Sequence, residues 1–148
     1  KSIGVSNYQV EQLEELLAYA RIKPVVNQIE YNPNLQQEEL IAYMKKNNIA
    51  FSVYGALAPL ISKNPQSLVD VIQSIADKHG KTTSQVLIKW TLQKGAAAVV
   101  TSSTKEERIK ELLDSTSFEL SSDEVEAISK EGNTDTVRKY WPAKLFDK

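Results

Sequence analysis

The sequence predicts an α/β fold built around a mostly parallel sheet. Four short apolar runs, rich in β-branched residues, recur along the 148 residues, and an amphipathic segment with helical spacing follows each of them. The runs are continuous rather than alternating, as is typical of strands in parallel sheets. No G-x-G-x-x-G follows the first run, so the glycine fingerprint of a dinucleotide-binding doubly wound sheet is missing.

The composition describes a single globular domain over residues 1–148. Lysine and arginine total 18 against 19 for aspartate and glutamate, which gives no electrostatic footprint for nucleic acid or an anionic membrane surface. The absence of cysteine excludes disulfides. No apolar run approaches the ~20 residues that a membrane helix needs. We therefore expect a cytoplasmic protein that binds neither nucleic acid nor membrane, and we assign no metal ligands.

The first βα unit opens the chain. Residues 3–5 are predicted to form a strand, and residues 6–20 have the apolar spacing of a helix. Ser6 and Gln9 have the form of a capping box, which predicts that this helix begins close to Ser6.

The second unit and the third strand follow the same pattern. Residues 25–31 are predicted to form a strand that Pro33 closes. Residues 34–48 are amphipathic and end in two lysines and two asparagines, as suits a helix C-terminus. Residues 49–55 are a third apolar run and predict the next strand.

Two helices are predicted before the fourth strand. The first spans about residues 64–80, with Asn64 as its cap, Pro65 at its first position and Gly80 past its end. The second spans about residues 82–95 and is capped by a threonine.

The last part of the chain completes the alternation. Residues 96–103 predict the fourth strand, and Ser103 with Glu106 has the form of a capping box for the helix that follows. Residues 121–132 predict a final helix before an irregular tail. Four such units suit either an open doubly wound sheet or part of a (β/α)₈ barrel, and a whole barrel typically takes ~250 residues.

Polar residues gather where the predicted strands end, which is where ligands bind in parallel α/β folds. Three of the four clusters consist of amides or hydroxyls, and the other offers an aromatic ring. Together they can hold a planar ring that carries a carboxamide, with Tyr54 stacked on it; helix capping is the alternative for any single cluster. The clusters are Ser6–Asn7, Asn27–Gln28, Tyr54–Gly55 and Thr101–Ser102–Ser103.

The motifs IGVSNY, VNQIEYNP, SVYGALAPL and VVTSSTKEERIKELL resemble those of the aldo-keto reductases in order and spacing. The resemblance covers nearly the whole chain, and the two successive helices before the fourth strand are also similar to that family. It implies a (β/α)₈ TIM barrel of which this chain supplies the C-terminal half, strands five to eight and the C-terminal loop. Lys1 is then expected to be a fragment boundary rather than a natural start.

The resemblance implies a binding site for NADPH (NADP⁺). Ser6, Asn7 and Gln28 match the residues that bind the nicotinamide carboxamide, and Tyr54 matches the tyrosine that stacks on the nicotinamide ring. The stretch from Gly55 to Ala58, with Leu57 kept, matches the loop that folds over the pyrophosphate. Many relatives read S-P-L-G there, whereas this chain reads G-A-L-A.

The adenosine end departs further from the family pattern. Many members read P-K-S after the eighth strand, where this chain reads Thr101–Ser102–Ser103, so a serine replaces the lysine. Ser103 and Arg108 match residues that bind the 2′-phosphate, and Glu111 matches a contact to adenine. The T-S-S form and the stretch RKYWPAKLF resemble a fungal subgroup that reduces conjugated polyketones and α-keto amides.

The resemblance implies an NADPH-dependent carbonyl reductase that acts on a small-molecule aldehyde or ketone, as a monomer or dimer. The family's catalytic tyrosine, lysine, aspartate and histidine come from the first half of the barrel, and no position here matches them. We therefore assign no catalytic residue and expect this chain alone to be inactive. His79 is expected to lie at the surface. The alternative is a catalytically inactive nucleotide-binding or regulatory protein of the same fold.

Overall fold

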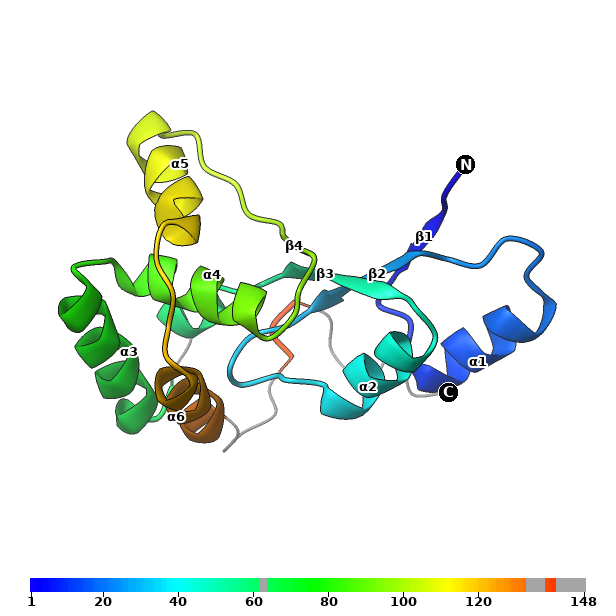
Figure 1. Ribbon diagram of the computed structural model, residues 1–148, viewed down its shortest axis with the longest axis horizontal. Helices are drawn as coiled ribbons and strands as arrows, with labels where there is room; N and C mark the ends of the chain where they lie inside the picture. Colours follow the sequence, from blue (N-terminus) through cyan, green and yellow to red (C-terminus); the bar gives the residue numbers. More distant parts are fainter. Residues whose placement is uncertain (62–63, 133–137, 141–148) are drawn as a thin grey trace.

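A computed structural model describes residues 1–61, 64–132 and 138–140. Its four strands form one parallel sheet in which each strand pairs with the one before it in the chain. Figure 1 shows this sheet across the middle of the molecule. The strands are β1 (Gly4–Ser6), β2 (Val26–Glu30), β3 (Ala50–Tyr54) and β4 (Ala98–Val99).

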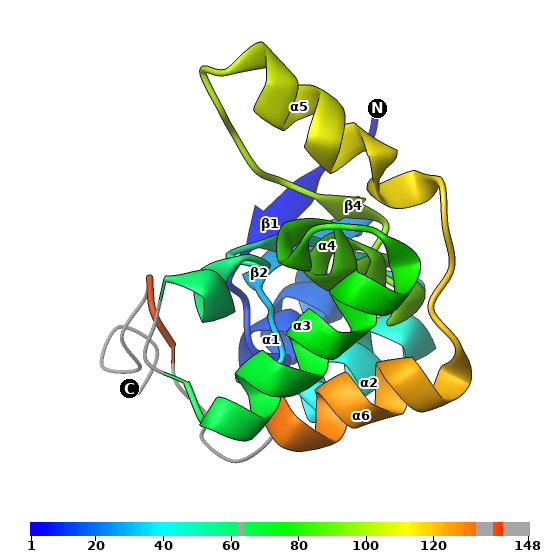
Figure 2. The same cartoon turned by 90° about the vertical axis from the view of Figure 1, so that its left-hand side faces the viewer.

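The helices surround this sheet unevenly. In Figure 1, α1 and α2 lie together below one end of the sheet, and α3 packs on α4 and α6 at the other end. In both Figures 1 and 2, α5 stands at the outside of the molecule, joined to β4 by an extended segment. The helices are α1 (Val10–Tyr19), α2 (Glu38–Lys46), α3 (Gln66–His79), α4 (Thr83–Gln93), α5 (Glu106–Leu113) and α6 (Ser122–Gly132), with 3₁₀ turns η1 (Ala58–Leu60) and η2 (Asp114–Thr116). None of the helices in the described ranges is both long enough and apolar enough to span a membrane.

The hydrophobic core lies between the sheet and the helices and includes a group of three aromatic rings. The ring of Tyr31 stacks on Trp90 at 5.3 Å and meets Phe51 edge-on at 5.7 Å. The indole Nε1 of Trp90 donates to the carbonyl of Val125 and to the Ser129 hydroxyl, at 3.2 and 3.1 Å. This group therefore ties α4 and α6 to the end of β2.

The other face of the sheet carries small and polar side chains. Side chains alternate between the two faces of a strand, so residues paired across the sheet share a face. One row of paired residues on this face is mostly apolar, and the next row is mostly polar. The rows are Gly4, Val26 and Ala50, and Ser6, Gln28, Ser52 and Ala98.

Two predicted helix boundaries are confirmed. Thr82 caps α4, since its hydroxyl accepts from the backbone N–H of Gln85 at 3.2 Å and the Gln85 side chain accepts from Thr82 N at 2.8 Å. Gly80 ends α3 with a φ of +60°, in the left-handed region that glycine adopts at low cost.

The predicted capping box of Ser6 and Gln9 is wrong. The first helix begins at Val10, and Gln9 itself is the cap, with its N–H bonded to the side chain of Gln12 at 2.9 Å. Ser6 remains in β1, where its hydroxyl donates to the carbonyl of Gln28 at 3.0 Å. A partner on the neighbouring strand therefore takes the hydroxyl that the local pattern assigns to a helix N-terminus.

Two other predicted caps are also wrong. Ser103 does not cap α5, which begins at Glu106, because its hydroxyl accepts from Lys105 N at 3.1 Å in a local turn. Asn64 does not cap α3, whose N-cap is Pro65. The Asn64 amide instead donates to the carbonyl of Pro59 and so holds the η1 turn.

Glu124 joins α6 to the end of α3. Its carboxylate accepts from Lys78 Nζ at 2.7 Å, from Ser121 N at 2.7 Å and from His79 Nε2 at 3.0 Å. Burial alone would raise the pKa of this carboxyl, but the hydrogen bonds outweigh it and lower the pKa to about 2. His79, expected at the surface, thus takes part in a contact between two helices.

We expect this contact to make stability depend on pH. Because the folded pKa is depressed from 4.5, Glu124 stabilises the fold fully above about pH 4.5, and this contribution is lost as pH falls toward 2. In urea unfolding, Glu124→Gln should cost ~1–2 kcal/mol at pH 7, discounted for the solvent exposure of Lys78, and much less at pH 3. Glu126→Gln, on the same helix, is the control. An equal cost of Glu124→Gln at both pH values would contradict the assignment.

Candidate functional site

The polar residues at the ends of β1, β2 and β3 form one hydrogen-bonded cluster. The carbonyl of Gln28 accepts from both the Ser6 hydroxyl, at 3.0 Å, and the backbone N–H of Asn7, at 2.9 Å. The phenol of Tyr54 donates to Asn7 Oδ1 at 2.7 Å, across 47 residues of sequence. Three neighbouring strands thereby present Ser6, Asn7, Gln28 and Tyr54 at a single edge of the sheet.

The geometry of Asn7 aims its side chain at Tyr54. Asn7 has a φ of +60°, a left-handed conformation that asparagine tolerates better than most residues. This turn ends β1 and fixes the phenol of Tyr54 by its hydroxyl. The pKa of Tyr54 is raised, chiefly by burial and then by the charge of Glu30, so the phenol stays protonated and donates.

The segment after Tyr54 is a tight turn. Gly55 has a φ of +74°, and its carbonyl accepts from Ala58 N at 3.0 Å, which leads directly into η1. Ala58 is buried and Leu57 is half-buried. A Cβ at Gly55 would lie 3.1 Å from the ring of Tyr140 and 3.2 Å from Cγ of Glu30, so these two side chains leave little room for a larger residue at this position.

The ring that lies against Gly55 belongs to residues 138–140, a segment that was not assigned to the site from the sequence. The fully buried carboxylate of Glu30 accepts from Lys139 N at 2.8 Å and from Tyr140 N at 3.2 Å. The ring of Tyr140 meets Tyr54 edge-on, with centroids 6.1 Å apart. Of the stretch RKYWPAKLF, only these three residues lie within the described part of the chain.

The residues after β4 belong to a second region. Thr101 and Ser102 are exposed, Ser103 is half-buried, and all three line a hollow of about 250 Å³. The rest of the lining is apolar and comes from β4, α4 and α5. Those residues are Val99, Ile88, Ile109, Leu112 and Leu113.

Arg108 and Glu111 face the start of α4. Arg108 donates through Nη1 to Glu111 Oε1 and through Nη2 to the hydroxyl of Ser84, both at 2.7 Å. Glu111 Oε1 also accepts from the Thr82 hydroxyl at 2.6 Å. Burial acts to raise the pKa of Glu111, but the hydrogen bonds from Thr82 and Arg108 prevail and lower it, so this carboxyl is ionised.

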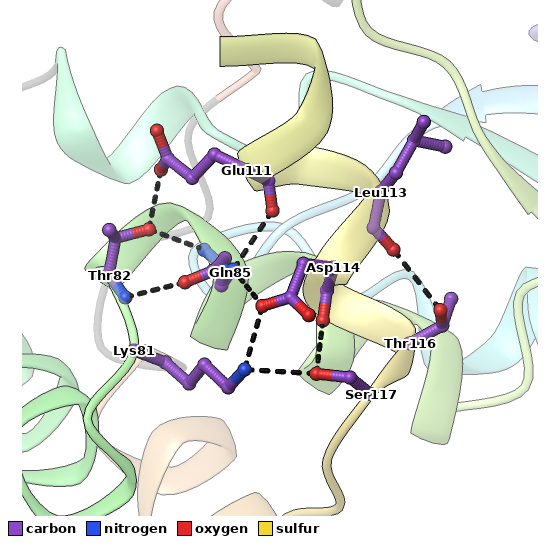
Figure 3. A network of polar contacts seen from close by, with 8 residues as sticks. All are labelled: Lys81, Thr82, Gln85, Glu111, Leu113, Asp114, Thr116 and Ser117. Carbon is purple, nitrogen blue, oxygen red and sulfur yellow. Dashed lines mark hydrogen bonds and ion pairs between the residues drawn. The ribbon is translucent and has the colours of Figure 1, made fainter. Parts of the chain in front are cut away.

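Further polar contacts hold α5 in this position, as Figure 3 shows. The amide of Gln85 donates to the carbonyl of Glu111 at 2.9 Å and to Asp114 Oδ2 at 2.8 Å. Lys81 Nζ reaches the same Asp114 oxygen at 2.7 Å. The N-terminus of α4 and the end of α5 are thus joined by contacts that keep Arg108 and Ser84 opposite each other.

The structure therefore brings together the first group of sequence-predicted residues, Ser6, Asn7, Gln28 and Tyr54, by direct hydrogen bonds. The second group divides, because Thr101–Ser103 line the hollow whereas Arg108 and Glu111 bond to each other and to α4. The sequence missed Ser84, Thr82, Glu30 and Tyr140. The sequence marks Thr82 as a candidate cap, Glu30 as the end of a strand and Tyr140 as part of the stretch RKYWPAKLF, but it assigns none of them to the site.

Comparisons with known proteins match this arrangement to one family. The model of the aldo/keto reductase family matches residues 1–132. A probable NAD(P)H-dependent D-xylose reductase of Aspergillus terreus is 40% identical over 139 residues, which cover 87% of this chain and 43% of that protein. An NAD(P)H-dependent pentose reductase of Pyricularia oryzae is 41% identical over 139 residues, covering 87% of this chain and 42% of that protein.

Solved structures agree with these matches. The aldose reductase of Schistosoma japonicum has a TM-score of 0.81 at 30% identity, with 95% of this chain and 43% of that chain covered. The aldose reductase of Giardia lamblia has a TM-score of 0.83 at 29% identity, with 96% and 48% covered. The chain spans less than half the length of these relatives.

Proposed function

The chain belongs to the aldo/keto reductase family, and on that premise we propose that it supplies the cofactor-binding part of an NADPH-dependent oxidoreductase that reduces aldehydes or ketones. Residues 1–148 are then the C-terminal half of the oxidoreductase domain, with β1–β4 as strands five to eight of a (β/α)₈ barrel. The parallel sheet of four strands and the share of each relative that is covered support this assignment.

The observation that carries the proposal is the cluster at the ends of β1, β2 and β3. A nicotinamide carboxamide has one acceptor oxygen and an NH₂ group, and the Ser6 hydroxyl with the Asn7 and Gln28 amides can serve both. The hydroxyl of Tyr54 is anchored on Asn7, so its half-buried ring is held in one plane. These residues fit the nicotinamide end of NADPH.

The remaining candidate residues fit the other parts of the cofactor. The turn from Gly55 to Ala58, including Leu57, offers backbone N–H groups for the pyrophosphate. The hollow lined by Thr101, Ser102 and Ser103 combines hydroxyls with an apolar wall, which suits an adenosine. The guanidinium of Arg108 suits the 2′-phosphate, and Glu111 suits an amino group of adenine.

The cofactor, when bound, supplies the hydride, and the residues of this chain bind it and orient its ring. The proton for the carbonyl oxygen comes from a tyrosine in sequence beyond these 148 residues.

The names of the fungal relatives support a sugar aldehyde as substrate, whereas Thr101–Ser103 favour the polyketone subgroup. NADPH oxidation by the full-length protein with D-xylose and with a conjugated polyketone decides between these substrates. NADPH binding without turnover of any carbonyl would favour the inactive alternative.

Changing Tyr54→Ala is expected to weaken NADPH binding by roughly 0.5–1.5 kcal/mol beyond the loss of contact area, the range for aromatic pairs. The loss follows from the missing ring face beside the nicotinamide. Fluorescence titration of the full-length protein measures it. Tyr19→Ala, which removes an exposed tyrosine on α1, is the control. Unchanged affinity in the Tyr54 variant would show that this ring only packs against Tyr140.

A further inference from the structure

The guanidinium of Arg108 lies between a neutral hydroxyl and a carboxylate. We infer that Ser84 and Glu111 change the preference for NADPH over NADH in opposite directions, Ser84 by anchoring Arg108 and Glu111 by the negative charge that it places beside Arg108. This inference rests on the proposed function, in which Arg108 meets the 2′-phosphate.

Ser84 holds the guanidinium in place. Its side chain is in the first turn of α4, and the residue is only 3% exposed. Its hydroxyl accepts from Nη2 of Arg108, while Nη1 is held by Glu111, each at 2.7 Å. A planar guanidinium bonded at both nitrogens cannot turn without losing a bond, so less freedom is lost when a phosphate binds. Ser84 is therefore a positioning residue that favours NADPH.

Glu111 acts in the other direction. The Thr82 hydroxyl and Arg108 both bond to its Oε1, which keeps the carboxylate charged and close to the guanidinium. A 2′-phosphate that contacts Arg108 comes near this negative charge and is repelled, whereas the 2′-hydroxyl of NADH is not. The carboxylate therefore lowers the advantage of NADPH without a matching effect on NADH.

Glu111 also anchors Nη1 of Arg108, and Glu111→Gln keeps this bond through its amide oxygen while it removes the charge. A contact of its side chain with adenine is common to NADPH and NADH, so the ratio of their affinities cancels it. The ratio of affinities therefore reports only on the group at the 2′ position. We predict that the two residues change this ratio in opposite directions.

The test uses Ser84→Ala and Glu111→Gln in the full-length protein. Dissociation constants for NADP⁺ and NAD⁺ are measured by calorimetry, and adenosine 2′,5′-bisphosphate and 5′-AMP repeat the comparison without the nicotinamide. Ser84→Ala should weaken NADP⁺ about 3- to 10-fold because the guanidinium loses one of its two anchors. Glu111→Gln keeps an acceptor oxygen but removes the charge, and should tighten NADP⁺ about 3- to 10-fold. NAD⁺ should change less than about two-fold in both.

Two matched variants serve as controls. Ser115→Ala removes another buried hydroxyl, in η2, and Glu107→Gln removes another charge from α5; both should leave the ratio unchanged. The inference is overturned if the affinity for NADP⁺ relative to NAD⁺ stays constant in the test variants or falls in both of them. If the wild-type protein binds neither nucleotide, the proposed function itself fails. If Ser84→Ala does not fold, Glu111→Gln still tests the effect of the carboxylate, because the affinity for NADP⁺ relative to NAD⁺ must rise in that variant.

Discussion

Changing Arg108→Ala is expected to raise the KM for NADPH about 10- to 100-fold and to change the KM for NADH less than about two-fold. A hydrogen bond to a charged group contributes about 1.5–3 kcal/mol, and only NADPH carries the 2′-phosphate that Arg108 is placed to meet. Steady-state kinetics of the full-length protein with both cofactors measure the difference. With Ser102 in place of a lysine, the preference of the wild-type protein for NADPH is expected to be smaller than in relatives that carry the lysine.

Two further variants make this measurement specific. Lys110→Ala removes a cation from the same helix, where it pairs with Glu106, and should leave both KM values unchanged. Arg108→Lys keeps the charge but lacks the planar fork that bonds to Ser84 and Glu111, so it should recover part of the loss. Equal losses for NADPH and NADH in Arg108→Ala would refute the assignment of the phosphate to this residue.

Changing Trp90→Ala is expected to destabilise the fold by ~3–5 kcal/mol, the range for removing a large aromatic from a core. Trp90 is fully buried and stacks on Tyr31, so its loss leaves a cavity between α4 and the sheet. The carbonyl of Val125 also loses a donor. Urea unfolding followed by circular dichroism gives the free energy of unfolding.

The matched variant is Trp90→Phe, which keeps a ring against Tyr31 but loses the indole N–H. It should cost less than Trp90→Ala, and Ser129→Ala should cost less still because it removes only one of two acceptors of that N–H. A cost below ~1.5 kcal/mol for Trp90→Ala would mean that the core around Tyr31 closes over the cavity.

The order of strands and helices could be predicted from the sequence because it follows from local patterns. Apolar runs and helical spacing are properties of neighbouring residues, and the end of α3 at Gly80 is fixed by a local backbone requirement. The starts of α1 and α5 could not be predicted in the same way. At Ser6, a hydroxyl with the right spacing for a cap bonds instead to a strand 22 residues away.

In the candidate site, too, the features that follow from local patterns could be predicted and the contacts between distant residues could not. The sequence predicts which chemical groups stand at the strand ends, since these positions follow from the strands themselves. It does not predict which groups bond to one another. Arg108 and Ser84 are 24 residues apart, and Glu30 and Tyr140 are 110 apart, so both contacts depend on the packing of distant segments. The resemblance assigned roles to single residues of its motifs, and it assigned none to Glu30 although the motif VNQIEYNP contains it.

The strand order of the sheet has a consequence for how the chain folds. Each strand pairs with the strand that was synthesised just before it, so every new βα unit can pack on a unit that is already complete. Because the paired strands are close in sequence, little loop-closure entropy is lost at each step. Helix α6 is different, because it packs on α3 and the carbonyl of Ser129 accepts from Gln36, 93 residues earlier. Assembly can thus proceed in the order of synthesis, with α6 closing the core only after β2, α3 and α4 are in place.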